Sequence, residues 1–508
     1  MNAPANANLF SRLFDHLDEP GRLAIETAEG ARISYGDLVA QAGRIANYLG
    51  TRGVKAGDRV AAQTEKSVAA LVLYLATVRA GAVYLPLNTA YTLNELDYFI
   101  GDAEPALVVC DPAKAEGIGP LAAKVGAKVD TLDADGNGSL AEGAAAMGAE
   151  FATVPRAGDD LAAILYTSGT TGRSKGAMLT HDNLASNSLS LVECWRFTSD
   201  DVLIHALPIY HTHGLFVASN VTLFARAAMI FLPKLDPERI IKLMSRATVL
   251  MGVPTFYTRM LQSPNLTKEA ASHMRLFVSG SAPLLAETHR EWSARTGHAV
   301  LERYGMTETN MNTSNPYDGD RLPGAVGFPL PGVSLRVTDP ETGKELARGE
   351  IGMIEVKGPN VFKGYWRMPE KTAAEFRADG FFITGDLGKI DARGYVHIVG
   401  RGKDLVISGG FNVYPKEVES EIDAIPGVVE SAVIGVPHAD FGEGVTAVVV
   451  KDKAAAVDEP AVLQALDGRL AKFKMPKRVL FVDDLPRNTM GKVQKNVLRE
   501  AYKDIYKR

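Results

Sequence analysis

The chain has few cysteines, no excess of basic charge and no hydrophobic run long enough for a membrane. Two cysteines, Cys110 and Cys194, in 508 residues cannot form a disulfide framework or a four-thiolate zinc site, so we expect thiols in a reducing compartment. The net charge of −5 predicts no general nucleic-acid surface. The apolar stretch 68–78 stops at Arg79 and is too short to span a bilayer. No secretion signal is evident at residues 1–10, and we expect a cytoplasmic protein without nucleic-acid or membrane partners.

The composition is that of a globular protein, with 46% hydrophobic and 23% charged residues. At roughly 150 residues per domain, the length predicts about three structural units. Through the first 300 residues, short apolar strands alternate with helical patterns, which favours parallel sheets covered on both faces. From about Pro329 the segments become short and glycine-punctuated, which indicates a small antiparallel β unit. A glycine-rich segment at 400–410 separates this unit from a final β/α part.

The strongest chemical signal is the segment 166–176, Tyr-Thr-Ser-Gly-Thr-Thr-Gly-Arg-Ser-Lys-Gly, which follows an apolar strand. Glycines let backbone N–H groups converge on an anion, hydroxyls add donors, and Lys175 adds a charge suited to phosphate. The segment is not a Walker A loop, because Ser174 and not glycine precedes the lysine, and it contains no GxGxxG. It therefore predicts a different kind of phosphate-binding loop.

This loop resembles that of the adenylate-forming acyl-CoA synthetases, and further motifs follow in that family's order along nearly the whole chain. They are 207–214 (LPIYHTHG), 279–284 (SGSAPL), 304–309 (YGMTET), 384–388 (TGDLG), 400–410 (GRGKDLVISGG) and 486–492 (PRNTMGK). The resemblance implies an α/β multi-domain fold. Its large N-terminal domain, 1–402, would hold two αβ subdomains and a small β-barrel at about 329–400. A small, mobile α+β C-terminal domain, 403–508, would follow a hinge near Lys403.

The resemblance also implies the nucleotide site, where a cation and donors must face the charge of the transition state. The loop would hold the ATP phosphates, and Thr170 and Glu308 would ligate Mg²⁺, a hard ion that prefers oxygen. Asp386 would accept the ribose hydroxyls, and Arg401 would contact the sugar or phosphate. The full set of implied ATP or AMP contacts is Thr167, Ser168, Gly169, Thr170, Thr171, Gly172, Lys175, Gly280, Ser281, Ala282, Glu302, Tyr304, Gly305, Met306, Thr307, Asp386, Arg401 and Lys492.

Two half-reactions are implied as well. Lys492 would contact the α-phosphate and acyl carboxylate only during adenylation, after which the C-terminal domain would rotate about Lys403. Ser408, Gly409 and Gly410 would then border the tunnel for the pantetheine arm of CoA, where glycine leaves room. The exposure that Lys492 needs predicts that acetylation would remove its charge and stop the reaction, with an acetyltransferase and a deacetylase as partners.

His211-Thr212-His213 has a spacing found in some metal sites, but the sequence has no companion HExxH or CxxC. We therefore interpret His211, by resemblance, as a neutral gate at the carboxylate and CoA tunnel, with a catalytic role beside Thr170, Glu308 and Lys492. His213 is interpreted as a packing residue.

The acid is indicated by Arg303, which precedes Tyr-Gly-Met-Thr-Glu where most relatives for long or aromatic acids carry a small residue. It follows the buried-strand pattern 299–301, and ligands bind at the carboxyl ends of such strands. A cation here shortens and charges the acyl pocket. Around 301–316 the chain closely resembles malonyl-CoA and methylmalonyl-CoA synthetases. The predicted substrate contacts are Arg303, Arg259, His211, Thr212, Ser281 and Met306.

The predicted reaction is malonate + ATP + CoA → malonyl-CoA + AMP + diphosphate. Three alternatives stay open from the sequence: a ligase for another short acid, an adenylating enzyme that loads a carrier protein, and a regulatory AMP-binding protein. The intact Lys492 motif argues against the last of these.

Overall fold

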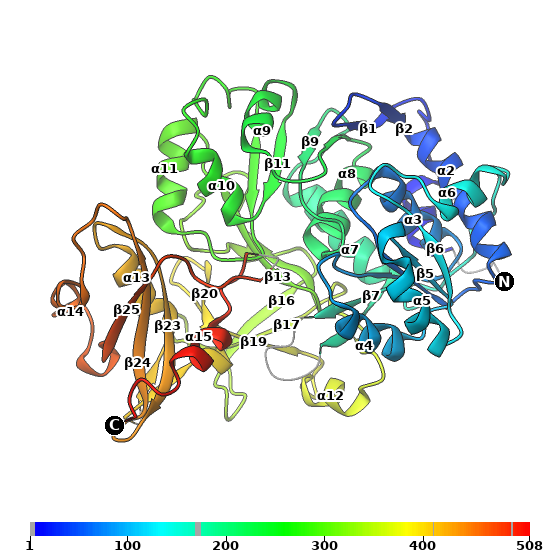
Figure 1. Cartoon of the computed structure of the whole chain (residues 1–508). Coiled ribbons are helices and arrows are strands. Elements are labelled where there is room, and N and C mark those ends of the chain that lie inside the picture. Colours follow the sequence, from blue (N-terminus) through cyan, green and yellow to red (C-terminus); the bar gives the residue numbers. More distant parts are fainter. Residues whose placement is uncertain (1–5, 168–173, 410, 489–490, 508) are drawn as a thin grey trace. The chain divides into compact units, whose positions relative to one another are not determined.

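The computed structural model describes residues 6–167, 174–409, 411–488 and 491–507. The chain divides into two compact units, one of Met1–Ser334 with Lys357–Phe382 and the other of Leu335–Val356 with Ile383–Arg508 (Figure 1). This division groups most of the small β unit with the C-terminal residues, whereas the sequence analysis placed it in the N-terminal domain. No helix in the described ranges has both the length and the apolar composition needed to cross a membrane.

The first unit contains a nine-stranded sheet whose central strands are parallel and whose edges are antiparallel. The order is β15-β14-β13-β12-β11-β9-β10-β1-β2. The strands are β1 (Leu23–Thr27), β2 (Arg32–Ser34), β9 (Val202–His205), β10 (Ala228–Phe231), β11 (Val249–Gly252), β12 (Leu276–Ser279), β13 (Leu301–Met306), β14 (Asn310–Ser314) and β15 (Phe328–Pro329). The predicted apolar strands are thus present and pair in parallel.

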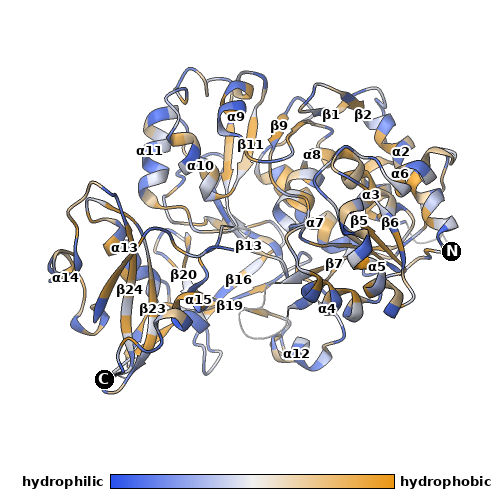
Figure 2. Ribbon diagram, viewed as in Figure 1, coloured by the Kyte–Doolittle hydropathy of each residue, from blue (hydrophilic) through white to orange (hydrophobic). Residues whose placement is uncertain are grey.

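A second, seven-stranded sheet has the order β18-β8-β7-β4-β3-β5-β6, with β7 to β6 parallel and β8 and β18 antiparallel. The strands are β3 (Arg59–Gln63), β4 (Val83–Pro86), β5 (Leu107–Cys110), β6 (Lys128–Thr131), β7 (Leu161–Thr167), β8 (Lys175–Thr180) and β18 (Gly364–Tyr365). Strand β5, buried at all four positions, has the hydrophobic colour in Figure 2, as expected for a strand covered on both faces.

Helices cover these sheets, and the buried α3 is apolar all round, as a helix without a solvent face must be. Figure 1 shows α9, α10 and α11 grouped beside β11. The helices of the first unit are α1 (Leu9–Phe14), α2 (Tyr35–Thr51), α3 (Val68–Arg79), α4 (Leu93–Ala103), α5 (Ala115–Lys124), α6 (Ser139–Ala145), α7 (His181–Cys194), α8 (Asn220–Phe224), α9 (Pro237–Leu243), α10 (Pro254–Leu261), α11 (Ala286–Thr296) and α12 (Pro369–Ala374), with the short η1 (Pro112–Lys114), η2 (His213–Ser219) and η3 (Met244–Arg246).

The second unit contains the predicted small β unit and the C-terminal β/α part. A four-stranded sheet has the order β16 (Ser334–Thr338), β17 (Gly352–Lys357), β19 (Phe382–Ile390) and β20 (Val396–Arg401). A five-stranded sheet follows, in which β25 pairs parallel to β24. Its strands and the helices of this unit are β21 (Val406–Ser408), β22 (Phe411–Val413), β23 (Val428–His438), β24 (Gly442–Lys451), β25 (Arg478–Val482), α13 (Pro415–Asp423), α14 (Glu459–Leu466), α15 (Lys495–Tyr502), η4 (Gly402–Asp404) and η5 (Lys472–Lys474).

Candidate active site

The two ends of the predicted phosphate loop lie on paired strands. Thr167 ends β7, Lys175 begins β8, and the two residues face each other in the antiparallel register. Ser168, Gly169, Thr170, Thr171 and Gly172 lie outside the described residues. The Lys175 ammonium lies 3.3 Å from the Glu375 carboxylate and 4.0 Å from the centre of the Tyr365 ring. The loop lysine is therefore held by an acid and an aromatic face that the sequence analysis did not identify.

Glu308, the predicted metal ligand, is buried at 6% exposure. Its carboxylate Oε1 accepts a hydrogen bond from the Tyr365 hydroxyl at 3.0 Å, and its backbone carbonyl accepts from the Phe362 N–H at 2.8 Å. A carboxylate offers the hard oxygen that Mg²⁺ prefers. No cluster of three or more acids, histidines or cysteines that could hold a metal occurs in the described part of the chain.

Arg303 is buried at the point where two neighbouring strands part. The parallel register of β12 and β13 ends at Ser279 and Glu302, so Arg303 is the next residue of β13 and Gly280 the next beyond β12. The guanidinium lies over the Gly280 backbone, because a Cβ at that glycine would meet Arg303 Cζ at 2.4 Å. The missing Gly280 side chain thus makes the space that the guanidinium occupies.

The Arg303 guanidinium is 4% exposed, and its Nε and Nη2 have no hydrogen-bond partner among the described residues. Burial lowers the pKa of this group to about 9, and the only further influence on it is the Tyr257 phenol, which raises the pKa. A buried, unpaired cation is costly. An arginine in this state is typical of a site that receives an anion.

His213 borders the same space. Its Nδ1 lies 3.2 Å from the Ser281 hydroxyl, while its buried Nε2 has no partner in the described structure. Burial and the nearby Arg303 cation hold the pKa of His213 well below its usual range, so the ring is neutral. Ser281 has a positive φ of 70°, a strained conformation that concentrates at functional sites. His213 is therefore a buried polar residue close to Ser281 and Arg303, in addition to the packing role that the sequence indicated.

The segment that carries His211 and Thr212 is held by contacts with His205 on β9. Thr212 is buried with its hydroxyl unpartnered among the described atoms, and His211 is half-buried. His205 Nε2 lies 3.0 Å from the Gly214 carbonyl, and the Lys66 ammonium lies 2.9 Å from His205 Nδ1. The sequence analysis missed this buried pair, since Lys66 lies outside every motif.

The remaining predicted residues of the 302–307 segment differ in their surroundings. Tyr304 is buried in β13, Met306 and Thr307 are half-buried, and Gly305 has no room for a side chain, because a Cβ would meet the Asn310 carbonyl at 1.9 Å. The Glu302 carboxylate faces His289 Nδ1 at 3.0 Å and the Gly324 N–H at 3.0 Å. Glu302 thus has protein partners for its carboxylate, and its predicted contact with the nucleotide stays a prediction.

Arg259 lies on the exposed face of α10 near its C-terminal end, unlike the buried Arg303. Ala282 follows the strained Ser281 and is half-buried. The structure thus brings Arg303, Gly280, His213 and Ser281 into contact, and it leaves Arg259 facing solvent.

In the second unit, Asp386 and Arg401 face each other across the β19–β20 ladder. The Arg401 Nε lies 2.7 Å from the Asp386 carboxylate, which is 6% exposed. Lys403 is exposed within η4, and its neighbour Asp404 forms an ion pair with Arg499. The predicted ribose acid Asp386 and the predicted hinge Lys403 are thus 17 positions apart, on a stretch formed by β19, β20 and η4.

The predicted tunnel and lysine residues also lie in this unit. Ser408 is buried, and Gly409 has a φ of 61° that L-residues rarely adopt; Gly410 lies outside the described residues. Lys492 is exposed, and its backbone N–H donates to Asn488 Oδ1 at 3.0 Å. The Asn488 N–H in turn donates to the Lys492 carbonyl at 2.9 Å, so Asn488 and Lys492 are paired through two hydrogen bonds.

Comparison with known proteins identifies the family. Residues 16–366 match the AMP-binding enzyme family, and 417–492 match the AMP-binding enzyme C-terminal domain. A malonate–CoA ligase of Arabidopsis thaliana is 37% identical over 530 residues, covering 94% of this chain and 86% of the relative. A feruloyl-CoA synthase of an Amycolatopsis species is 36% identical over 478 residues, covering 93% and 94%.

Among solved structures, ATP-bound MatB from Rhodopseudomonas palustris matches with 81% identity and a TM-score of 0.98, covering 99% of this chain and 100% of that one. The resemblance and the fold class inferred from the motifs are confirmed. The chain belongs to the AMP-binding enzymes, and within them to the AMP-forming acyl-CoA ligases.

Proposed function

We propose that the chain is an ATP-dependent malonyl-CoA synthetase, which converts malonate, ATP and CoA into malonyl-CoA, AMP and diphosphate through a malonyl-adenylate; methylmalonate is a second candidate substrate. The relatives act on acids as different as malonate and ferulate by name, so family membership alone leaves the acid open. The observation that carries the proposal is the buried Arg303 guanidinium with two unpartnered nitrogens.

Malonate keeps one carboxylate after the other has been activated, and that group must be paired if it is to leave water. The planar guanidinium of Arg303 matches a carboxylate bidentately. The neutral His213 ring and the Ser281 hydroxyl, 3.2 Å apart, would border the acid, with His211, Thr212 and Met306 around its α-carbon. Arg259 stays a second proposed contact, although its exposure makes it the weaker one.

For the nucleotide, we propose that Lys175 and the loop hold the phosphates, that Gly280 to Ala282 and Tyr304 flank the adenine, and that Asp386 binds the ribose. Glu308, with Thr170, would hold Mg²⁺, which supplies positive charge opposite the phosphate oxygens. The burial of the Glu308 carboxylate beside a hydrogen-bond donor supports this role. Lys175 contributes a further cation for the charge that develops in adenylation.

Thioester formation is assigned to a second arrangement of the C-terminal domain, 403–508, hinged at Lys403, with the barrel residues 329–400 kept in domain 1–402. Lys492 would act in adenylation only, and Ser408 to Gly410 would border the CoA tunnel. The exposure of Lys492 fits both this role and control by reversible acetylation. Two thiols without a disulfide support a reducing, cytoplasmic location.

The test is ATP–diphosphate exchange with a panel of acids, with and without CoA. We expect exchange that depends on malonate and does not require CoA, because the adenylate forms first. Exchange with butyrate or acetate in preference to malonate would refute the substrate. Transfer to a carrier protein but not to CoA would favour the carrier-loading alternative.

A further inference from the structure

The Tyr365 hydroxyl lies between two carboxylates of the first unit. It is 3.0 Å from Glu308 Oε1 and 2.6 Å from Glu375 Oε2. A tyrosine hydroxyl carries its proton at neutral pH, so it can donate to these acids. A phenol has one hydrogen to donate, and it cannot fully serve two carboxylates. The Tyr365 hydroxyl therefore connects the two carboxylates through one shared donor.

Glu375 already has such compensation. The Lys371 ammonium lies 2.7 Å from Glu375 Oε1, and the Lys175 ammonium lies 3.3 Å from the same atom. These two cations and the phenol hold the pKa of Glu375 below its usual value. Glu375 therefore fixes the Tyr365 hydroxyl from one side, while the same hydroxyl contacts the Glu308 carboxylate on the other.

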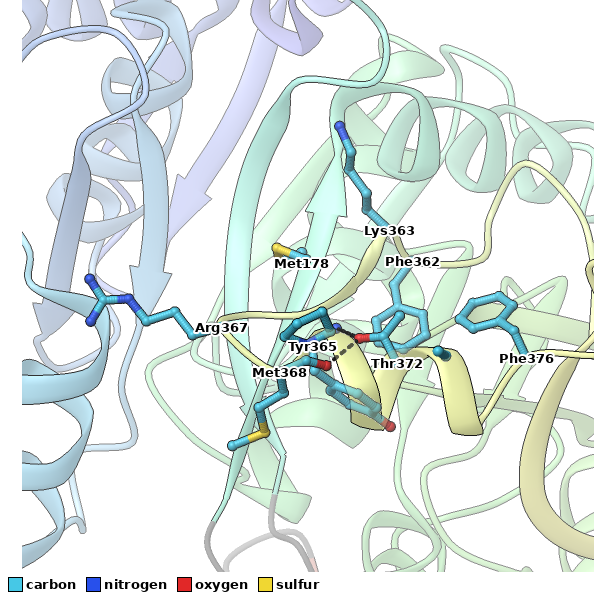
Figure 3. Close-up of a pocket in the computed structure, with 10 residues that line it drawn as sticks. Met178, Phe362, Lys363, Tyr365, Arg367, Met368, Thr372 and Phe376 are labelled. Carbon is cyan, nitrogen blue, oxygen red and sulfur yellow. Dashed lines mark hydrogen bonds between the residues drawn. The ribbon is translucent and has the colours of Figure 1, made fainter.

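The Tyr365 side chain is fixed by its backbone and its neighbours. The Tyr365 N–H donates to Thr372 Oγ1 at 2.9 Å, and the Thr372 hydroxyl donates to the Met368 carbonyl at 2.9 Å, so the first turn of α12 clamps β18 (Figure 3). A hollow of about 600 Å³ lies beside this clamp, and Tyr365, Met368 and Thr372 are among the residues that line it. The Phe362 ring packs edge-on against the Tyr365 ring at 4.8 Å.

The same short segment connects the two predicted phosphate-site motifs. Strand β18 pairs with β8 directly after Lys175, with Tyr365 opposite Ala177. Three residues before Tyr365, the Phe362 N–H donates to the Glu308 carbonyl. A displacement of Tyr365 would thus affect Lys175, which lies over its ring. It would also affect the Glu308 carboxylate, which accepts a hydrogen bond from its hydroxyl.

We propose that Tyr365 is a positioning residue that orients the Glu308 carboxylate for Mg²⁺, with Glu375 fixing the phenol and holding Lys175. This rests on the proposed metal role of Glu308. Groups that orient a metal ligand typically change metal affinity or activity by roughly 10- to 100-fold when removed. The effect of Tyr365 should therefore be seen in the Mg²⁺ dependence of ATP binding and not only in turnover.

The experiment measures the Kd of ATP with and without Mg²⁺ by titration calorimetry, for the wild type and for Tyr365→Phe. The phenylalanine ring keeps the packing against Phe362 and the face toward Lys175. We expect the ratio of metal-free to Mg²⁺-bound Kd to fall by about tenfold, with the metal-free Kd within twofold of wild type. A ratio equal to wild type within twofold would overturn the proposal.

Tyr35→Phe is the matched control, because it removes a buried phenol that donates at 2.8 Å to the Ala227 carbonyl. It should leave the ratio unchanged even if it lowers the melting temperature. If Tyr365→Phe does not fold, Thr372→Val removes the acceptor of the Tyr365 N–H and should lower the ratio by about threefold; an unchanged ratio there would equally refute the idea. A wild type whose ATP affinity ignores Mg²⁺ would instead refute the metal role of Glu308.

Discussion

Replacement of Arg303 by alanine should separate malonate from monocarboxylic acids. The guanidinium is fully enclosed, and Nε and Nη2 are without partners among the described residues, so a bound carboxylate can take two charge-assisted hydrogen bonds. Each such bond contributes roughly 1.5–3 kcal/mol. Truncation would also leave the carboxylate buried and unpaired, which costs about 2–5 kcal/mol. We expect a loss of at least ~3 kcal/mol in kcat/KM for malonate, or roughly 150-fold.

Butyrate has no second carboxylate, so the same substitution should change its kcat/KM by less than about fivefold. The assay is the steady-state rate of AMP formation with each acid at saturating ATP and CoA, for wild type, Arg303→Ala and Arg259→Ala. The exposed Arg259 should matter less than Arg303. An equal loss for both acids in Arg303→Ala would mean that Arg303 supports the fold or the nucleotide, and it would refute the dicarboxylate argument.

A stability measurement provides an independent check on the same residue. Arg303 carries a buried charge that the ligand-free protein does not pair, so Arg303→Met, which roughly keeps the volume, should raise the melting temperature of the ligand-free protein. Malonate should stabilise the wild type by mass action and not this variant. A lower melting temperature for Arg303→Met would indicate that the guanidinium is a structural element.

Three further substitutions test other parts of the account. Lys492→Ala should lower diphosphate exchange by about 100-fold but retain thioester formation from supplied malonyl-adenylate; equal loss of both would contradict the two-state role of this exposed lysine. Thr212→Gly removes a buried side chain and should raise kcat/KM for ethylmalonate relative to malonate by about tenfold. An unchanged ratio would mean that Thr212 does not contact the acid. Burial, together with Arg156, lowers the pKa of His181 to about 4 from 6.5, so the unfolded state binds more protons between these values and the free energy of unfolding should decrease as the pH falls from 6.5 toward 4. Urea unfolding at pH 7 and pH 5 measures this difference in the free energy of unfolding, which should be smaller in His181→Asn. An unchanged difference would show that His181 is not its source.

The parts of the structure that sequence patterns predicted are those set by local signals. The apolar strands that became β5, β9 and β10, and the helix α3, follow from runs of buried residues with polar or glycine ends. The sequence placed Arg303 directly after a buried strand at 299–301, whereas the strand is β13 (Leu301–Met306) and Arg303 lies within it, directly after the part that pairs in parallel with β12.

The unpredicted contacts join residues far apart in the chain. Tyr365 and Glu308 are 57 positions apart, Lys175 and Glu375 are 200 apart, and Lys66 and His205 are 139 apart. No spacing rule connects such pairs, because tertiary packing decides them. The sequence placed Arg303 before Arg259 as the candidate partner of the second carboxylate, and the structure has Arg303 buried and Arg259 exposed.

Glu302 has carboxylate partners that the motif did not reveal. It precedes the predicted adenine-binding segment, yet its carboxylate is paired with His289 and the Gly324 N–H. A buried carboxylate needs partners wherever it lies, and the contact of Glu302 with the nucleotide stays a prediction.

The central claim, that malonate is the acid activated, is tested most directly by the thioester product. Wild-type protein would be incubated with ATP, Mg²⁺ and CoA and an equimolar mixture of malonate and butyrate, and the acyl-CoA products would be separated and identified by mass. We expect malonyl-CoA as the dominant product, with one AMP formed per thioester. Butyryl-CoA in excess, or thioester formation accompanied by ADP instead of AMP, would contradict the account.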